Sequence, residues 1–202
     1  MTQKRWYAVV YMFGVTAFFS SMIIGLARVT AERVHANEQL ALERAVLTAL
    51  GQAQGKTNAE IHRMFVEEFE PMPGDNSFKW VKDGTVVGYA VGIAGKGFWA
   101  PIAGIIGLKP DRRTVTGIAF YEQNETPGLG AEITKPAFRR QFEGLELAPG
   151  PQPISIRPYG AQLDKNAVHA ISGATQTCMR LEVLINEDLR QWLEGPAEEA
   201  GK

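Results

Sequence analysis

The sequence predicts an α+β fold, in which a single N-terminal transmembrane helix precedes a twisted, mostly antiparallel sheet of about five strands packed with helices. Three observations predict it. Residues 6–27 form an uncharged apolar run. The middle of the chain alternates apolar and polar residues between Gly- and Pro-rich turns, which is typical of strands. Residues 174–193 carry apolar residues at helical spacing, which indicates a long amphipathic helix.

The apolar run at 6–27 is long enough to cross a bilayer, because about 20 such residues span it as a helix. Trp6, Tyr7 and Tyr11 near one end are typical of residues at a membrane interface. The alternative is a cleaved signal peptide with its cleavage site at 29–31, but the apolar part of a signal peptide usually has about 7–15 residues. We therefore expect an uncleaved anchor, whose orientation the flanking basic residues indicate only weakly.

Composition changes along the chain predict its division into segments. The region after the apolar run reads as an amphipathic helix followed by a short helix, which Thr57 and Glu60 begin with a capping box. We expect five segments: an N-terminus at 1–5, the transmembrane helix at 6–27, a helical stalk at 28–70, a folded domain at 71–194 and a disordered tail at 195–202.

Short strands and turns fill the predicted domain. Asp83-Gly84 is a strong hairpin turn between two strand-like runs. A short helix at 136–142 ends before Gly144, and prolines bound a short edge strand at 154–157. The other expected strands lie at 78–82, 85–94, 102–108 and 114–121.

Charge and cysteine content exclude several kinds of site. Lysine and arginine total 21 against 22 acidic residues, so there is no electrostatic case for nucleic-acid binding. Cys178 is the only cysteine, which excludes an intrachain disulfide, a Cys-rich zinc site, an iron–sulfur cluster with four ligands from this chain and a C-x-x-C-H haem site. We expect no metal, and any redox chemistry requires an organic cofactor.

The stretch 171–177, ISGATQT, opens the last helical pattern. Ser172 suits the N-cap, where its hydroxyl accepts a backbone N–H. Gly173 leaves room for a ligand to approach, and Thr175 falls in the first turn, where free N–H groups and the helix dipole favour a phosphate. This pattern indicates either an ordinary capped helix or a phosphate-binding site that contains a hydroxyl.

A second stretch, YEQNETPGLGAE at 121–132, is a turn that follows a strand. Thr126 is pushed into an extended conformation by the proline after it, and Pro-Gly favours a type II turn with positive φ at Gly128. Gly130 leaves the backbone bare, so that a flat ring has room to lie close, and Leu129 offers it an apolar contact. A plain strand-to-helix connection is the alternative, but it needs fewer residues.

Together, the two stretches resemble the FMN-binding domain family, in particular the C subunit of the sodium-translocating NADH:quinone oxidoreductase and the G subunit of the related Rnf complex. The resemblance runs from about residue 95 to residue 192, and His169 stands where the family usually has an acidic residue. Three further segments carry it, at 95–99, 114–118 and 136–144.

This resemblance implies that Thr175 carries FMN through a phosphoester bond, as the threonine of the S/T-G-A-T motif does in that family. Thr175 is then a tether, and no residue of the site is expected to be catalytic. The expected cofactor-binding residues are Thr175, Ser172, Gly173, Ala174 and Thr177 at the helix, and Glu125, Thr126, Gly128, Leu129 and Gly130 in the turn.

The resemblance also implies a membrane-anchored flavoprotein subunit that relays electrons in an ion-translocating Nqr- or Rnf-type complex, rather than a complete enzyme. It implies other membrane subunits as partners, a flavin transferase for maturation, and a single pass through the bacterial inner membrane with the domain on the periplasmic side. A stand-alone FMN-dependent membrane reductase and a flavin-free assembly module remain as alternatives. Consistent with a subunit, the sequence shows no Gly-rich nicotinamide fingerprint after a strand.

Three further residues have two readings each. Trp99 is either a core anchor or a wall beside the flavin ring, and we expect the core because large aromatic residues dominate cores. His169 is either a flavin neighbour or a loop residue, and Arg157 either meets a phosphate or lies on the surface. We expect His169 to be a loop residue and Arg157 to lie on the surface.

Overall fold

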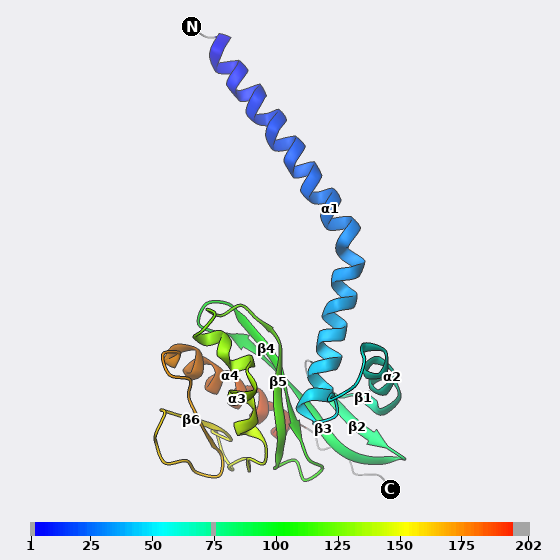
Figure 1. The fold of residues 1–202 in the computed structure, drawn as a ribbon, viewed down its shortest axis with the longest axis vertical. Helices are drawn as coiled ribbons and strands as arrows, with labels where there is room; N and C mark the ends of the chain where they lie inside the picture. The colour runs from blue at the N-terminus through cyan, green and yellow to red at the C-terminus, as the bar shows by residue number, and fades with distance from the viewer. Residues whose placement is uncertain (1–2, 74–75, 196–202) are drawn as a thin grey trace. The chain divides into compact units, whose positions relative to one another are not determined.

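The computed structural model describes residues 3–73 and 76–195, and Figure 1 shows them as a ribbon. The predicted tail at 195–202 lies outside these residues apart from Gly195, as do the first two residues of the predicted N-terminus. The chain divides into two compact units, 1–39 and 40–202. The second unit therefore begins well before residue 71, where the sequence predicts that the folded domain starts.

The first unit is the N-terminal part of the helix α1, Gln3–Ala49. An 18-residue stretch of this helix has a mean hydropathy of 1.9, and none of it is buried. The helix is long and apolar enough to cross a membrane, and it continues through 29–31 without a break. A signal sequence near an N-terminus is also able to meet these criteria of length and hydropathy, so they do not by themselves establish a membrane anchor.

The second unit is built on a five-stranded antiparallel sheet in which each strand pairs with the next along the chain. The sequence predicts four of these strands to within about two residues. The first strand has only three residues and ends in a proline, which is too short for an alternating pattern. The strands are β1 Phe69–Pro71, β2 Phe78–Lys82, β3 Thr85–Lys96, β4 Pro101–Leu108 and β5 Val115–Gln123.

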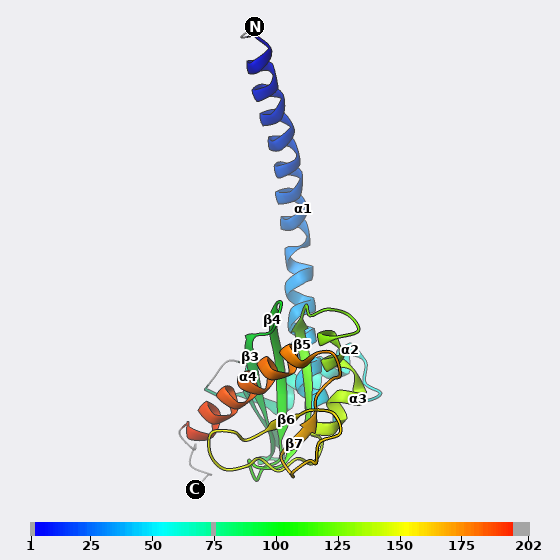
Figure 2. The same ribbon diagram turned by 90° about the vertical axis from the view of Figure 1, so that its left-hand side faces the viewer.

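Two separate apolar cores form because successive side chains of a strand point to opposite faces of the sheet. In one core, Ile93 and Ile106 pack with Leu181 and Ile185 of α4, Thr175–Glu194. Figure 2 shows α4 lying across the sheet. The predicted α+β fold, with a long apolar N-terminal helix before an antiparallel sheet packed with helices, is confirmed.

The second core lies between the sheet and the N-terminal segment of this unit. Val46 and Leu47 at the end of α1 pack with Ile105 and Ala119 of the sheet. The helix α2, Asn58–Glu68, adds Ile61 and begins with the predicted capping box. The segment 40–70 therefore supplies part of a core, because a sheet with two apolar faces needs cover on both.

The end of α1 approaches the sheet backbone closely. The Thr116 hydroxyl donates to the Ala49 carbonyl over 2.7 Å. A Cβ at Gly107 would lie 2.4 Å from the Ala49 carbonyl oxygen, and a Cβ at Gly117 would lie 3.0 Å from it. Glycine at both positions is what allows a helix end to rest directly on two strands.

A second, small sheet and three short helices complete this unit. The predicted edge strand at 154–157 is β6, Ser155–Arg157, and it pairs in parallel with β7, Ala167–His169. The sequence does not predict β7, because three residues carry too little pattern. The predicted helix at 136–142 is divided between α3 and η2. The short helices are η1 Gly130–Thr134, α3 Pro136–Arg139 and η2 Arg140–Phe142.

Asn186 is a buried polar residue in the middle of α4. Its side-chain oxygen accepts the Ile154 N–H over 2.9 Å, and its side-chain nitrogen donates to the Ile154 carbonyl over 2.8 Å. The amide therefore satisfies both backbone groups of the residue that precedes β6.

Candidate functional site

The structure brings the two motif stretches together at the start of α4, where Figures 1 and 2 both show the turn after β5 beside the helix. A Cβ at Gly130 would lie 2.6 Å from the Thr177 hydroxyl. A Cβ at Gly173 would lie 3.1 Å from a methyl group of Leu129. The residues predicted to form one site, from two parts of the sequence, are therefore neighbours.

The predicted turn geometry is confirmed. Gly128 has a φ of +76°, and the Leu129 N–H donates to the Thr126 carbonyl over 3.1 Å. This is the four-residue turn that Pro127-Gly128 favours, with glycine at the position of positive φ. The turn leaves Thr126, Gly128 and Leu129 exposed.

Glu125 is buried at the centre of the site, with 5% of its surface exposed. Its Oε1 accepts the Trp99 N–H over 2.9 Å and the Ala100 N–H over 3.4 Å. Its Oε2 accepts the Thr177 hydroxyl over 2.8 Å. One carboxylate thus joins three segments: the turn after β5, the loop between β3 and β4, and the first turn of α4.

Two glycines make room for this carboxylate. A Cβ at Gly97 would lie 2.6 Å from its Oε1, and a Cβ at Gly130 would lie 2.8 Å from its Oε2. The sequence predicts that the bare backbone of Gly130 admits a flat ring, but Glu125 and Thr177 fill the space that its side chain would take. We call these four buried residues the frame: Glu125, Thr177, Gly97 and Gly130.

The pKa of Glu125 lies below its ordinary value. Burial, the largest single influence, raises the pKa because it disfavours the charged form. Hydrogen bonds from the Trp99 N–H, the Thr177 hydroxyl and the N–H groups of Ala100 and Phe98 lower it by more in sum. Glu125 is therefore ionised at neutral pH.

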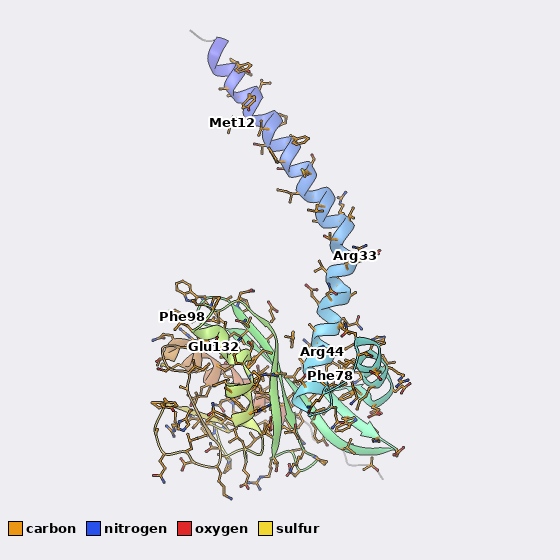
Figure 3. All side chains as sticks on the ribbon, in the orientation of Figure 1. Met12, Arg33, Arg44, Phe78, Phe98 and Glu132 are labelled. Atoms are coloured by element: carbon orange, nitrogen blue, oxygen red, sulfur yellow. The ribbon has the colours of Figure 1, made fainter. Side chains whose placement is uncertain are left out.

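Other side chains of the site face outward. Thr175 is exposed at the first position of α4, Leu129 is 43% exposed and Trp99 is 70% exposed. The prediction that Trp99 lies in the core is wrong, because Glu125 anchors only its backbone and leaves the indole outside. We call these three residues the rim. Figure 3 labels Phe98, whose ring meets the Trp99 ring edge to face at 5.0 Å.

The start of α4 differs from the prediction. The N-cap is Ala174, which offers no side-chain hydrogen bond, so the prediction of Ser172 as the cap is wrong. The physical reason is a tight turn: Gly173 has a φ of +80°, and the Ala174 N–H donates to the Ile171 carbonyl over 3.1 Å. The helix therefore begins after Ser172, and within residues 3–73 and 76–195 no side-chain hydrogen bond caps its first N–H groups.

The remaining candidates lie outside these contacts. The Gln141 side chain holds the backbone of His169 at both its N–H and its carbonyl, over 2.9 and 3.3 Å. Arg157 is exposed. Cys178 is buried, and burial raises the pKa of its thiol. Among the residues that the structure describes, no group of three or more His, Cys, Asp and Glu side chains is arranged to hold a metal ion.

The described part of the second unit contains two cavities, one of which reaches the rim at Trp99. One of about 530 Å³ is mainly apolar and is bordered by Trp99, Pro101 and Glu122. The other, of about 330 Å³, is bordered by Arg139, Arg140 and other residues. Thr175 borders neither, so the start of α4 is an open surface site.

Residues 97–189 match the FMN-binding domain family. The C subunit of the Na⁺-translocating NADH-quinone reductase from Neisseria meningitidis is 38% identical over 98 residues, which is 48% of this chain and 38% of the relative. The protein of the same name from Pasteurella multocida is 38% identical over 102 residues, 49% of this chain and 37% of the relative. These matches span under two fifths of the length of the relatives.

Solved structures show the same fold. NqrC from Shewanella oneidensis superimposes with a TM-score of 0.64 at 22% identity, over 77% of this chain and 97% of that one. The NqrC-type protein from Parabacteroides distasonis superimposes with a TM-score of 0.65 at 22% identity, over 80% and 94%. The predicted resemblance to the FMN-binding domain family and to the NqrC proteins is confirmed, and the matched residues include both motif stretches.

Proposed function

We propose that this chain is a membrane-anchored flavoprotein subunit that carries FMN on Thr175 and relays electrons within an Nqr- or Rnf-type complex. The observation that carries the proposal is the contrast between two hydroxyls in one helical turn. Thr175 is exposed at the uncapped start of α4, whereas the Thr177 hydroxyl is buried and donates to Glu125. The exposed hydroxyl is the one that a transferase is able to reach.

The start of α4 fits the phosphate end of FMN. The first hydrogen bond inside the helix is the one from the Cys178 N–H to the Ala174 carbonyl, so the preceding N–H groups lack helical acceptors. These groups and the positive end of the helix dipole favour an anion. Gly173 and Ala174 add no long side chain in front of them, and Ser172 is exposed beside them.

The rim fits the ring end of FMN. Trp99 and Leu129 are large apolar side chains that stay exposed at two segments joined by Glu125. An isoalloxazine ring packed against them would bury apolar surface that now faces water. Bound FMN supplies reversible electron transfer, while the residues around it set its orientation and electronic environment.

Covalent loading is tested by co-expression of the full chain with a flavin transferase, followed by flavin fluorescence on a denaturing gel and peptide mass mapping. Thr175→Val keeps the shape and removes the hydroxyl, so its band should not fluoresce. Thr175→Ser is the matched control, because it restores a hydroxyl at the same place. A fluorescent Thr175→Val band, or a flavin mapped to Ser172 or Thr177, contradicts the proposal.

The membrane part of the proposal assigns residues 6–27 to an uncleaved helix in the bacterial inner membrane, crossed once, with the second unit on the periplasmic side. It is supported by the length and hydropathy of α1 and by the NADH-quinone reductase relatives. N-terminal sequencing of the protein from membranes should return the intact start. A mature chain that begins near Glu32 contradicts the anchor.

The relay requires partners, which we propose to be other membrane subunits of the complex. Tagged full chain from native membranes should co-purify with further redox subunits, and the purified loaded chain alone should not turn over soluble electron donors. Turnover by the chain alone supports the stand-alone reductase instead. A native chain without flavin supports the assembly module.

A further inference from the structure

We propose that Glu125 is a positioning residue, whose carboxylate holds the loop bearing Trp99 at a fixed distance from the helix turn bearing Thr175. It acts on the cofactor through these two segments and does not touch it. The consequence for flavin rests on the proposed function. The link between the two segments does not depend on a bound cofactor or on the proposed function.

The two oxygens of the carboxylate serve different segments. Oε1 takes the N–H groups of Trp99 and Ala100, and Oε2 takes the hydroxyl of Thr177. Trp99 forms one part of the rim, and Thr177 lies two residues after Thr175 in the same helix. A displacement of Glu125 therefore changes the separation between the ring contact and the tether.

Both carboxylate oxygens of Glu125 accept hydrogen bonds from the protein. Its side chain is 5% exposed, and both oxygens take donors from neighbouring segments. A buried carboxylate without partners is strongly unfavourable, so these hydrogen bonds hold it in one place. Burial and these hydrogen bonds separate the role of Glu125 from that of the exposed residues beside it.

The close packing makes the length of this side chain important. Gly97 and Gly130 have no room for even a Cβ where they meet the carboxylate. Aspartate at position 125 keeps the charge but is about 1.5 Å shorter, so it cannot reach both the loop and the helix. Glutamine keeps the length, and its carbonyl oxygen is still able to accept the Trp99 N–H.

Hydrogen exchange of the unloaded full chain in detergent micelles tests the link. In Glu125→Asp, the Trp99 and Ala100 amides should exchange about tenfold faster, as expected for loss of a hydrogen bond to a charged group. Amides of the buried strand β4 should change much less. Glu125→Gln should restore most of the protection. Glu122→Asp is the matched control, because the same change is made at an exposed residue of β5 and should have no effect.

Equal acceleration of the Trp99 and β4 amides would show general destabilisation and overturn the positioning role, as would no acceleration at either. In the FMN-loaded chain, Glu125→Asp should lower the fluorescence anisotropy of the flavin, and Glu122→Asp should not. Unchanged anisotropy overturns the effect of Glu125 on the cofactor. Absence of covalent FMN from the wild-type chain contradicts the proposed function instead and leaves the amide result standing.

Discussion

The rim and the frame are built from neighbouring residues yet have opposite surroundings. Thr175 and Leu129 face solvent, whereas Thr177 and Gly130, one or two positions away, are buried against Glu125. The frame is satisfied by contacts within the protein, while the rim leaves apolar surface and a hydroxyl uncovered. A short motif therefore encodes both a ligand surface and the support that holds this surface in place.

A substitution in the frame should therefore affect folding, and one in the rim should affect only the cofactor. The sharpest comparison uses two glycines of one turn. In Gly130→Ala the new Cβ would lie 2.6–2.8 Å from the atoms of Thr177 and Glu125, so we expect a loss of about 3 kcal/mol in the free energy of unfolding.

Gly128→Ala is the control for that prediction. Its φ is +76° but nothing lies within 4 Å of the new Cβ, so only backbone strain of about 1 kcal/mol is expected. Urea unfolding of both variants measures the difference. If the two substitutions are equally destabilising, the contact of Gly130 with the frame is not important for folding.

The two threonines of α4 provide the next comparison. Thr177→Val leaves Oε2 of the buried Glu125 without its donor, so we expect a loss of about 1–3 kcal/mol. Thr175→Val changes an exposed residue and should stay within about 0.5 kcal/mol of the wild type. Chemical denaturation of the unloaded chain measures both, and a reversed order contradicts the division into rim and frame.

The charge of Glu125 makes the frame sensitive to pH. Because the pKa of Glu125 is lowered in the folded state, its ionised form stabilises the fold at pH values above its ordinary pKa of 4.5. This contribution is lost as the pH falls from 4.5 through the lower folded-state value. The difference in unfolding free energy between wild type and Glu125→Gln should therefore shrink below pH 4.5. A difference that stays constant there contradicts an ionised Glu125.

The smallest effect on stability is expected at the rim. Trp99→Ala removes a side chain that is 70% exposed, so the unfolding free energy should change by less than about 0.5 kcal/mol. In the loaded chain, however, iodide should quench the flavin fluorescence more strongly, because one apolar contact of the ring is gone. Leu163→Ala, at an exposed apolar residue outside the rim, is the control and should leave quenching unchanged.

The longer strands, the motif-bearing helix and the turn at Gly128 could be predicted from sequence, because alternation, helical spacing and Pro-Gly chemistry act over a few residues. The three-residue strands β1 and β7 are too short to show such a pattern. The frame could not be predicted. Glu125 contacts Trp99, which lies 26 positions earlier, and Thr177, which lies 52 positions later, and no local pattern reveals such contacts. The same limit explains the wrong prediction for Trp99. Its large aromatic side chain is typical of a core, but the residue lies in the loop between β3 and β4.

Asn186 has a consequence for the axial register of α4. It lies eleven residues after Thr175, which is about three turns and ~16 Å along the helix axis. A slip of the helix by one residue, about 1.5 Å, would leave the buried amide and both backbone groups of Ile154 without partners. Like a single buried asparagine in a coiled coil, this amide selects one register among otherwise similar apolar packings. The axial position of the Thr175 hydroxyl at the start of α4 is thus fixed by Asn186 near the middle of the helix.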